Sequence, residues 1–143
     1  MNPELDARTD KKSKIVLGVD DAIDNLVLLK AAIEADGYTF VGAQSGGECL
    51  ALLGKIVPKF ILLDVQMPGL DGFETCRRLR RMPGLHDVPV AFVTTRKTAD
   101  DVKTAVAVGG NDFIAKPYEV PTLLERTHYW TARKARPRLI GFE

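Results

Sequence analysis

The chain has 143 residues, of which 45% are hydrophobic and 27% are charged, and its formal net charge is +1 at pH 7. This length and composition are typical of one globular domain and exclude a disordered or membrane protein. No apolar run is long enough to cross a bilayer or to form a secretory signal, so we expect no membrane insertion and a cytoplasmic location.

Charge is distributed unevenly along the chain. Residues 1–120 carry 15 Lys and Arg against 17 Asp and Glu, whereas residues 121–143 carry five against two. The near-neutral total therefore conceals a basic C-terminal segment. We predict a polar N-terminal extension over residues 1–13, a folded domain over 14–127 and an arginine-rich tail over 128–143.

Strand and helix patterns alternate in chain order. Strands are predicted at residues 14–19, 38–43, 60–63, 88–93 and 112–115, and the first, third and fourth runs are almost wholly apolar, as in buried parallel strands. Amphipathic helices are predicted over 25–35, 46–56, 73–82, 100–109 and 119–132. This order favours an α/β fold, with a parallel five-stranded sheet wound by helices on both faces.

Cysteine and histidine usage argues against a disulfide or a zinc site. Cys49 and Cys76 each lie within a helical pattern, so we expect two buried free thiols. His86 and His128 are too few and too scattered to hold zinc.

Polar residues follow four of the predicted strands, at the edge of the sheet where the strands end. They are, in chain order, Asp20, Asp21, Asp64, Thr94 and Lys116. Three adjacent carboxylates repel one another unless a hard cation such as Mg²⁺ neutralises them. A hydroxyl and an ammonium beside them would bind the oxygens of a phosphoryl group carried by one carboxylate. Together they predict an aspartyl-phosphate site, although each residue alone could be a helix cap, a backbone-bonded hydroxyl or a solvated loop residue.

Four segments resemble, in order and spacing, the receiver domain of bacterial response regulators, which has the CheY-like, flavodoxin-like (βα)5 fold. They are "IVLGVDDAIDNLVLL", "ILLDVQMPGLDGFE", "VPVAFVTT" and "GGNDFIAKPYEVPTLL", and the match covers residues 14 to about 127. The resemblance implies that Asp64 is the phosphoacceptor. A histidine kinase or a phosphotransfer protein would supply the phosphoryl group. It also implies that Asp21 and Asp64 bind Mg²⁺ directly with the Gln66 carbonyl, while Asp20 acts through water.

The same resemblance assigns roles to the last two strands. Thr94 and Lys116 would bind phosphoryl oxygens, and the Lys116–Pro117 peptide bond would be cis. Phe113 takes the place of the aromatic switch residue, with a simple core side chain as the alternative. Thr95 stands where the family usually has alanine, and we expect its bulk to narrow access to the site.

The tail combines aromatic and guanidinium groups in "HYWTARKARPRLIGFE", residues 128–143. Arginine pairs bidentately with guanine and aromatic rings stack on bases, so the composition suits a small guanine-containing ligand. A receiver followed by such a tail resembles the Cle subgroup of CheY-like proteins, which implies binding of cyclic di-GMP and contact with the flagellar motor switch protein. The candidate ligand residues are Arg126, Tyr129, Trp130, Arg133, Arg136 and Arg138.

Other functions remain open at this stage. The chain could be an ordinary single-domain phosphorelay or chemotaxis regulator with no nucleotide binding, or its tail could bind acidic lipid or RNA. An aspartate-based phosphatase is disfavoured because such enzymes need a second carboxylate two residues after the nucleophile, where this chain has Gln66. We therefore expect the protein to catalyse no reaction beyond the turnover of its own aspartyl phosphate. We also expect that it does not bind DNA and that it acts through contacts of its own surface or tail.

Overall fold

The structure is a computed structural model, and it describes Lys11 and residues 13–133. Strands and helices alternate strictly along these residues. The strands are β1 (Ile15–Val19), β2 (Thr39–Ala43), β3 (Phe60–Leu63), β4 (Val90–Thr94) and β5 (Asp112–Ala115). The helices are α2 (Ile23–Ala35), α3 (Gly46–Leu53), α4 (Gly72–Leu79), α5 (Ala99–Ala107) and α6 (Val120–Ala132).

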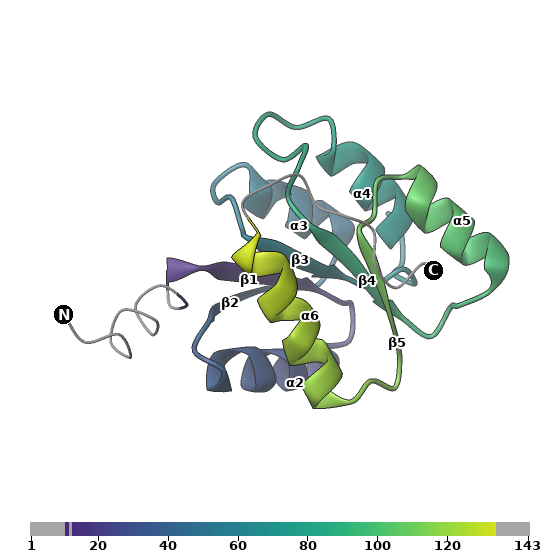
Figure 1. Cartoon of the computed structure of the whole chain (residues 1–143). Coiled ribbons are helices and arrows are strands. Elements are labelled where there is room, and N and C mark those ends of the chain that lie inside the picture. Colours follow the sequence, from purple (N-terminus) through teal and green to yellow (C-terminus); the bar gives the residue numbers. More distant parts are fainter. Residues whose placement is uncertain (1–10, 12, 134–143) are drawn as a thin grey trace.

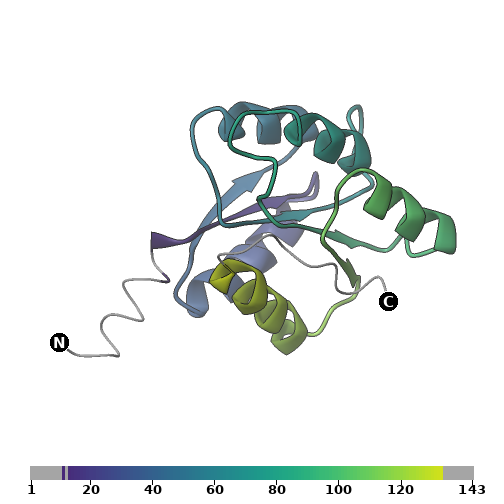
Figure 2. The ribbon, with the colours of Figure 1, turned by 45° about the horizontal axis from the view of Figure 1, so that its top comes forward.

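All strand pairs are parallel, and the strands form one sheet in the order β2-β1-β3-β4-β5. Helices α2 and α6 cover one face, and α3, α4 and α5 cover the other (Figure 1). The turned view in Figure 2 shows the sheet lying between these two helical layers. The predicted doubly wound, flavodoxin-like fold is therefore confirmed.

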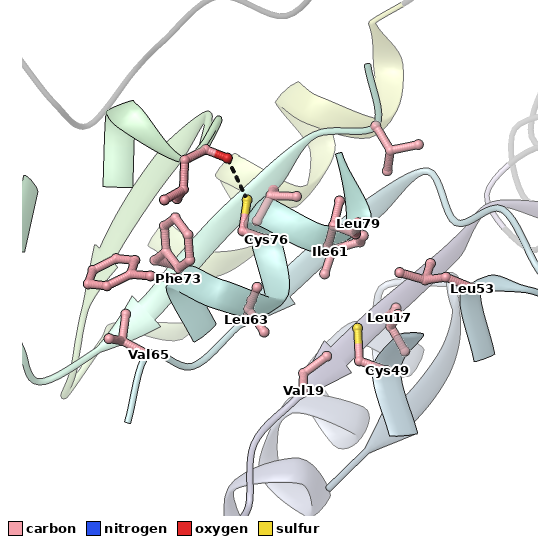
Figure 3. Packing of buried hydrophobic residues seen from close by; sticks show 14 of the residues in the cluster. Leu17, Val19, Cys49, Leu53, Ile61, Leu63, Val65, Phe73, Cys76 and Leu79 are labelled. Carbon is pink, nitrogen blue, oxygen red and sulfur yellow. Dashed lines mark hydrogen bonds between the residues drawn. The ribbon is translucent and has the colours of Figure 1, made fainter. Parts of the chain in front are cut away.

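The two apolar layers explain why β3 and β4 read as unbroken apolar runs. Every residue of these strands is buried, because each face of the central sheet meets a helical layer. Cys49 and Cys76 lie in the layer of α3 and α4 as free thiols, as predicted, and the Cys76 thiol lies 3.4 Å from the Val108 carbonyl oxygen (Figure 3).

Side-chain caps fix where three helices begin after the polar edge of the sheet. Ser45 accepts from the Glu48 N–H at the start of α3, and Asp71 accepts from the Glu74 N–H at the start of α4. Thr98 begins α5 with a reciprocal capping box. These caps satisfy backbone donors that a helix otherwise leaves open, and they hold the loops that carry the site.

The predicted boundary between the folded domain and the tail, after Thr127, falls inside helix α6. Helix α6 continues to Ala132, as its pattern predicted, and both Trp130 and Thr131 are buried. The folded unit therefore includes the first residues that we assigned to the tail. Residues 1–10, 12 and 134–143 lie outside the described part of the chain, so the predictions of an N-terminal extension and of the rest of the tail stay predictions.

None of the helices in the described part of the chain is both long enough and apolar enough to span a bilayer.

Candidate functional site

Three carboxylates meet at the edge of the sheet where β1 and β3 end. Oxygen atoms of Asp20, Asp21 and Asp64 lie within 4.8 Å of one another. Asp20 and Asp64 are buried, and Asp21 is exposed. A hard divalent cation prefers such an oxygen donor set, so these residues fit Mg²⁺, as the prediction from the strand ends required.

Asp20 is held by three donors. Its Oδ1 accepts from the Ala22 N–H at 2.9 Å, and its Oδ2 accepts from Asn25 Nδ2 at 3.0 Å. The ammonium of Lys116 lies 2.6 Å from the same Oδ2. The role of Asn25 was not predicted from the sequence. An asparagine in the first turn of a helix has no local pattern that distinguishes it from a solvated residue.

Asp64 is more weakly held than Asp20. Its Oδ1 accepts from the Gln66 N–H at 3.4 Å, and Lys116 Nζ lies 3.6 Å from its Oδ2. Burial raises the pKa of Asp64, the Lys116 ammonium opposes that rise, and the Asp20 carboxylate adds to it. Asp64, the carboxylate that we predict to react, therefore has longer contacts to its donors than Asp20 has.

Thr94 and Lys116 reach the same edge from β4 and β5. Thr94 is fully buried, and its hydroxyl oxygen accepts from the Arg96 N–H at 3.2 Å. The Lys116–Pro117 peptide bond is cis, as predicted. The structure therefore brings the carboxylates, the ammonium and the hydroxyl to one rim.

Thr95 and Gln66 lie exposed beside this rim. The Thr95 hydroxyl is 3.3 Å from Gln66 Oε1, so the two side chains bond to each other across the loops after β4 and β3. The contact joins Thr95 to the loop that follows Asp64, and the predicted narrowing of access stays a prediction.

A cavity of about 430 Å³ opens beside the acidic cluster, between α2 and the loop that leads into α6. Asp20, Asp64 and Lys116 line its polar end. Apolar side chains line the remainder, including Leu28, Leu29, Leu62, Val93 and Val120. The site thus combines a charged rim with an apolar recess.

Phe113 is 9% exposed and packs in the same apolar cluster as Phe92, its partner in the pairing of β4 with β5. A buried ring fits a core side chain, and it also fits a switch aromatic in its inward position. Its role as a switch therefore remains a prediction.

The predicted ligand residues that the structure describes lie on helix α6 or, for Arg133, at its C-cap. The ring of Trp130 is 1% exposed, and its Nε1 donates to Asp112 Oδ2 at 2.9 Å. The ring packs in the core between the sheet and α6, so it presents no exposed face to a nucleotide in this structure, and its role as a ligand residue stays a prediction. Arg126 is likewise engaged, in an ion pair with Asp112.

Tyr129 and Arg133 form a pair at the C-terminal end of α6. Arg133 Nη1 donates to the Tyr129 hydroxyl at 3.0 Å, and its guanidinium carbon lies 5.0 Å from the Tyr129 ring centroid. The predicted ligand residues Arg136 and Arg138 lie outside the described residues.

Asp112 was not predicted to have a role, and it is completely buried at the start of β5. A carboxylate inside an apolar strand pattern is a signal that sequence analysis could have used, because a buried charge needs partners. Its partners, Arg126 and Trp130, lie on α6 and could not be identified from local sequence.

Comparison with known proteins agrees with this geometry. The family model for the response regulator receiver domain matches residues 16–128. This chain belongs to the response regulator receiver family, a class of signalling modules in two-component systems that interact with histidine kinases or phosphotransfer proteins and bind Mg²⁺ at an acidic site.

Individual relatives cover the same part of the chain. Response regulator PleD of Caulobacter vibrioides is 36% identical over 119 residues, which are 83% of this chain and 26% of PleD. Protein PilH of Pseudomonas aeruginosa is 34% identical over 110 residues, 77% of this chain and 91% of PilH. The chain therefore spans about a quarter of PleD but most of PilH.

Solved structures show the same fold. The chemotaxis protein CheY4 of Vibrio cholerae superposes with a TM-score of 0.79 at 29% identity, covering 82% of this chain and 98% of that one.

Proposed function

We propose that this chain is a response regulator that accepts a phosphoryl group on Asp64 and binds cyclic di-GMP through its arginine-rich segment, residues 128–143. It would then signal by protein–protein contact, with the flagellar motor switch as the target that controls motility and surface attachment. This function would make it a member of the Cle subgroup.

The acidic cluster opposite Lys116 is the main observation that supports the proposed phosphorylation of Asp64. A carboxylate oxygen of Asp64 attacks the phosphorus of a phosphohistidine, the P–N bond breaks, and the imidazole leaves. The Lys116 ammonium, 3.6 Å from Asp64 Oδ2, and the Thr94 hydroxyl would bind the transferred phosphoryl oxygens. Mg²⁺ held by Asp20, Asp21, Asp64 and the Gln66 carbonyl would supply neutralising charge.

Phosphorylation is tested with a small acyl phosphate and Mg²⁺, with mass spectrometry of the intact chain as the measurement. We expect one phosphoryl group on the unmodified protein and none on Asp64→Asn. Asp24→Asn is the matched control, because Asp24 is exposed in the first turn of α2 and lies outside the cluster. Equal modification of the Asp64→Asn variant would refute Asp64 as the acceptor.

The phosphodonor must approach over the rim, where several apolar side chains are exposed. Ile23, Val27 and Leu28 of α2 are 55%, 58% and 63% exposed, and Val120 at the start of α6 is 47% exposed. We call these four residues the rim patch. Leu28 and Val120 also line the cavity that contains Asp64. An apolar patch beside the reacting group suits a partner helix that presents the phosphohistidine.

This docking role is tested by the rate of phosphoryl transfer to the variant Val27→Ser. The donor is a purified histidine kinase or phosphotransfer protein, chosen as the one that phosphorylates the unmodified chain fastest. We expect transfer from that protein to slow at least fivefold, while phosphorylation by the small acyl phosphate stays unchanged. Val57→Ser is the control, since the exposed fraction of Val57, 62%, is close to that of Val27 and Val57 lies outside the rim patch. Unchanged protein-to-protein transfer in Val27→Ser would exclude the patch.

Two features at the end of α6 support the cyclic di-GMP part of the proposal. Arg133 and Tyr129 already form a stacked, hydrogen-bonded pair of the kind that recognises bases. Arg133 Nε is buried and has no hydrogen-bond partner among the described residues. The basic composition of residues 128–143 supplies charge for the ligand phosphates.

Calorimetric titration of cyclic di-GMP into the intact chain tests this binding, with GTP as competitor. We expect guanine-selective binding that weakens at least tenfold in Arg133→Ala and in Arg136→Ala. Arg77→Ala is the control, because Arg77 is an exposed arginine on α4, on the opposite face of the sheet. The motor target is then tested by binding of the loaded protein to the purified flagellar motor switch protein.

One observation favours the alternative, an ordinary regulator with no nucleotide binding. Trp130 and Arg126 both serve the fold through Asp112, which leaves fewer groups free for a ligand. Absence of binding heat would support that alternative. Salt-sensitive binding of RNA or anionic vesicles without guanine preference would instead assign the basic segment to those partners.

A further inference from the structure

The cavity beside Asp64 lies between α2, the sheet and the start of α6, on the face of the sheet that these two helices cover (Figure 1). Its volume of about 430 Å³ falls within the range of small-molecule sites, which is about 300–1,000 Å³. The proposed phosphoryl transfer takes place at the rim and makes no use of the deeper apolar space. Side chains from all three parts of the fold enclose that space, namely Leu28, Leu29, Leu62, Val93, Tyr118 and Val120.

The polar end of this cavity carries more negative than positive charge. Asp20, Asp64 and Lys116 line it, so two carboxylates face one ammonium. A carboxylate oxygen of Asp21 lies within 4.8 Å of those of Asp20 and Asp64 and adds a third negative charge nearby. An anionic ligand head would be repelled by this excess, whereas a cationic head would be attracted to it.

Asp64 is the carboxylate at this end that can accept a further donor. Asp20 already accepts from three donors at distances of 2.6–3.0 Å. The contacts of Asp64 with the Gln66 N–H and with Lys116 Nζ are longer, at 3.4 Å and 3.6 Å. A buried carboxylate is stabilised by a closer charged donor, and a primary ammonium carries three N–H donors.

We propose that this cavity is a binding site for a small primary amine with an apolar tail. The ammonium donates to Asp64, and the tail lies among the apolar side chains between α2 and the start of α6. Because Asp64 also belongs to the acidic cluster, the amine competes with Mg²⁺. Inhibition of phosphorylation by the amine rests on the proposed function, whereas binding of the amine does not.

Hexylamine is the probe for this site, and it is titrated into the full chain in EDTA at about pH 7, where a primary amine is protonated. The measurement is the chemical shift of the Leu28, Leu29 and Val93 methyl groups in ¹H–¹³C NMR spectra. We expect these signals to shift with hexylamine and to stay in place with hexanoate. Hexan-1-ol should bind at least about tenfold more weakly, because it lacks the charge.

The same titration has two outcomes that would overturn the proposal. Equal affinities for hexylamine and hexan-1-ol would refute recognition of the ammonium. Methyl signals that stay in place at every hexylamine concentration would refute the site itself. Addition of Mg²⁺ at ten times its dissociation constant should weaken hexylamine binding at least about fivefold, because the two cations share Asp64.

Leu28→Ser and Val27→Ser form a matched pair that tests where the tail lies. Both residues are exposed on α2, at 63% and 58%, but only Leu28 lines the cavity. We expect Leu28→Ser to weaken hexylamine binding at least about threefold, because an apolar contact with the tail is lost. Val27→Ser should bind as the unmodified chain does. Equal affinities of the two variants would contradict the placement of the tail.

Asp64→Asn tests the contact with the ligand head in the same way. We expect hexylamine to bind at least about tenfold more weakly to this variant, because the carboxylate charge is lost. Asp24→Asn is the control, since Asp24 lies in the first turn of α2, outside the cavity lining and the acidic cluster. Unchanged affinity in Asp64→Asn would refute the proposed contact.

The final measurement tests inhibition, with Mg²⁺ at its dissociation constant and the small acyl phosphate as donor. We expect saturating hexylamine to slow phosphorylation at least about fivefold, because it displaces Mg²⁺ from Asp64, and we expect hexanoate to leave the rate unchanged. An unchanged rate with bound hexylamine would refute inhibition. Absence of phosphorylation in the amine-free protein would refute the proposed function, and the titration would still decide the site.

Discussion

Gly72 lies directly against the backbone of Asp64 and Val65, which follow β3. A Cβ atom at this position would be 2.1 Å from the Asp64 carbonyl oxygen and 2.8 Å from Val65 Cα. Both neighbours are main-chain atoms of a buried segment and cannot rotate away. We expect Gly72→Ala to destabilise the protein by about 1–3 kcal/mol in urea unfolding, because the first turn of α4 must move away from β3.

Gly47→Ala is the matched control for this prediction. Gly47 also lies in the first turn of a helix, α3, and a Cβ there would meet nothing within 4 Å. We expect its unfolding midpoint to stay the same or to rise, because alanine restricts the unfolded chain. A loss in Gly47→Ala as large as that in Gly72→Ala would contradict the steric explanation.

The two thiols lie in the apolar layer under α3 and α4, and burial raises the pKa of Cys49 to about 12 and that of Cys76 to about 11. Since the thiolate is the reactive form, we expect alkylation by iodoacetamide at pH 8 to be at least about tenfold slower in the native protein than in urea. Rapid labelling of the native protein would show that this layer opens easily.

The same pKa shifts predict a pH dependence of stability. Both folded values exceed the ordinary thiol value of 9.0, so deprotonation favours the unfolded chain. The contribution of the thiols is fully present below pH 9 and is lost as the pH rises toward 11 and 12. Urea midpoints at pH 8 and pH 10 should therefore differ more for the unmodified protein than for the double variant Cys49→Ala, Cys76→Ala.

At the scale of the elements, Arg80 at the end of α4 forms hydrogen bonds with the segments that precede β4 and β5. Its guanidinium donates to the Gly109 and Leu85 carbonyls at 2.7 Å and 2.9 Å, and to the Val88 carbonyl at 2.7 Å. It also donates to Asn111 Oδ1, which in turn accepts from the Val90 N–H. One side chain thus joins α4 to the turns that precede β4 and β5.

We expect Arg80→Met to cost about 3 kcal/mol of unfolding free energy, because the apolar stem is kept while buried carbonyl groups lose their donor. Arg77→Met on the same helix is the control. Arg77 is exposed and pairs with Glu74, so it should show no measurable loss. Similar urea midpoints for the two variants would argue against the role of Arg80 as a clamp.

Stability of the whole molecule should depend on divalent cations. Asp20, Asp21 and Asp64 repel one another in the folded chain and separate on unfolding, so Mg²⁺ binds the native state selectively. At a Mg²⁺ concentration ten times the dissociation constant, we expect a gain of about 1.4 kcal/mol. Thermal unfolding with Mg²⁺ and with EDTA measures this gain, which should largely disappear in Asp64→Asn and persist in Asp24→Asn.

Most of the fold and of the acidic site could be predicted from sequence. The apolar runs of β1, β3 and β4 and the periodic stripes of the helices are local patterns, and strict alternation leaves few topologies for a parallel sheet. Asp20, Asp21, Asp64, Thr94 and Lys116 follow strand ends, so the direction of the strands alone brings them to one edge.

The role of α6 could not be predicted in the same way. The basic segment and its aromatic residues suggested that Tyr129 and Trp130 serve a ligand together, whereas packing against the sheet placed Trp130 in the core. The pairing of Asp112 with Trp130 joins residues 18 positions apart, and that of Arg80 with Gly109 spans 29 positions.

The sequence by itself determined the order of the elements, the residues of the acidic rim and the basic character of the C-terminal segment, because these properties depend on residue identity and local period. Only the tertiary structure decided which groups are buried, that α6 belongs to the packed domain through Ala132, and that Asp112 ties this helix to β5. The physical reason is that burial and charge pairing are set by neighbours in space, and those neighbours are brought together only when the helix packs on the sheet.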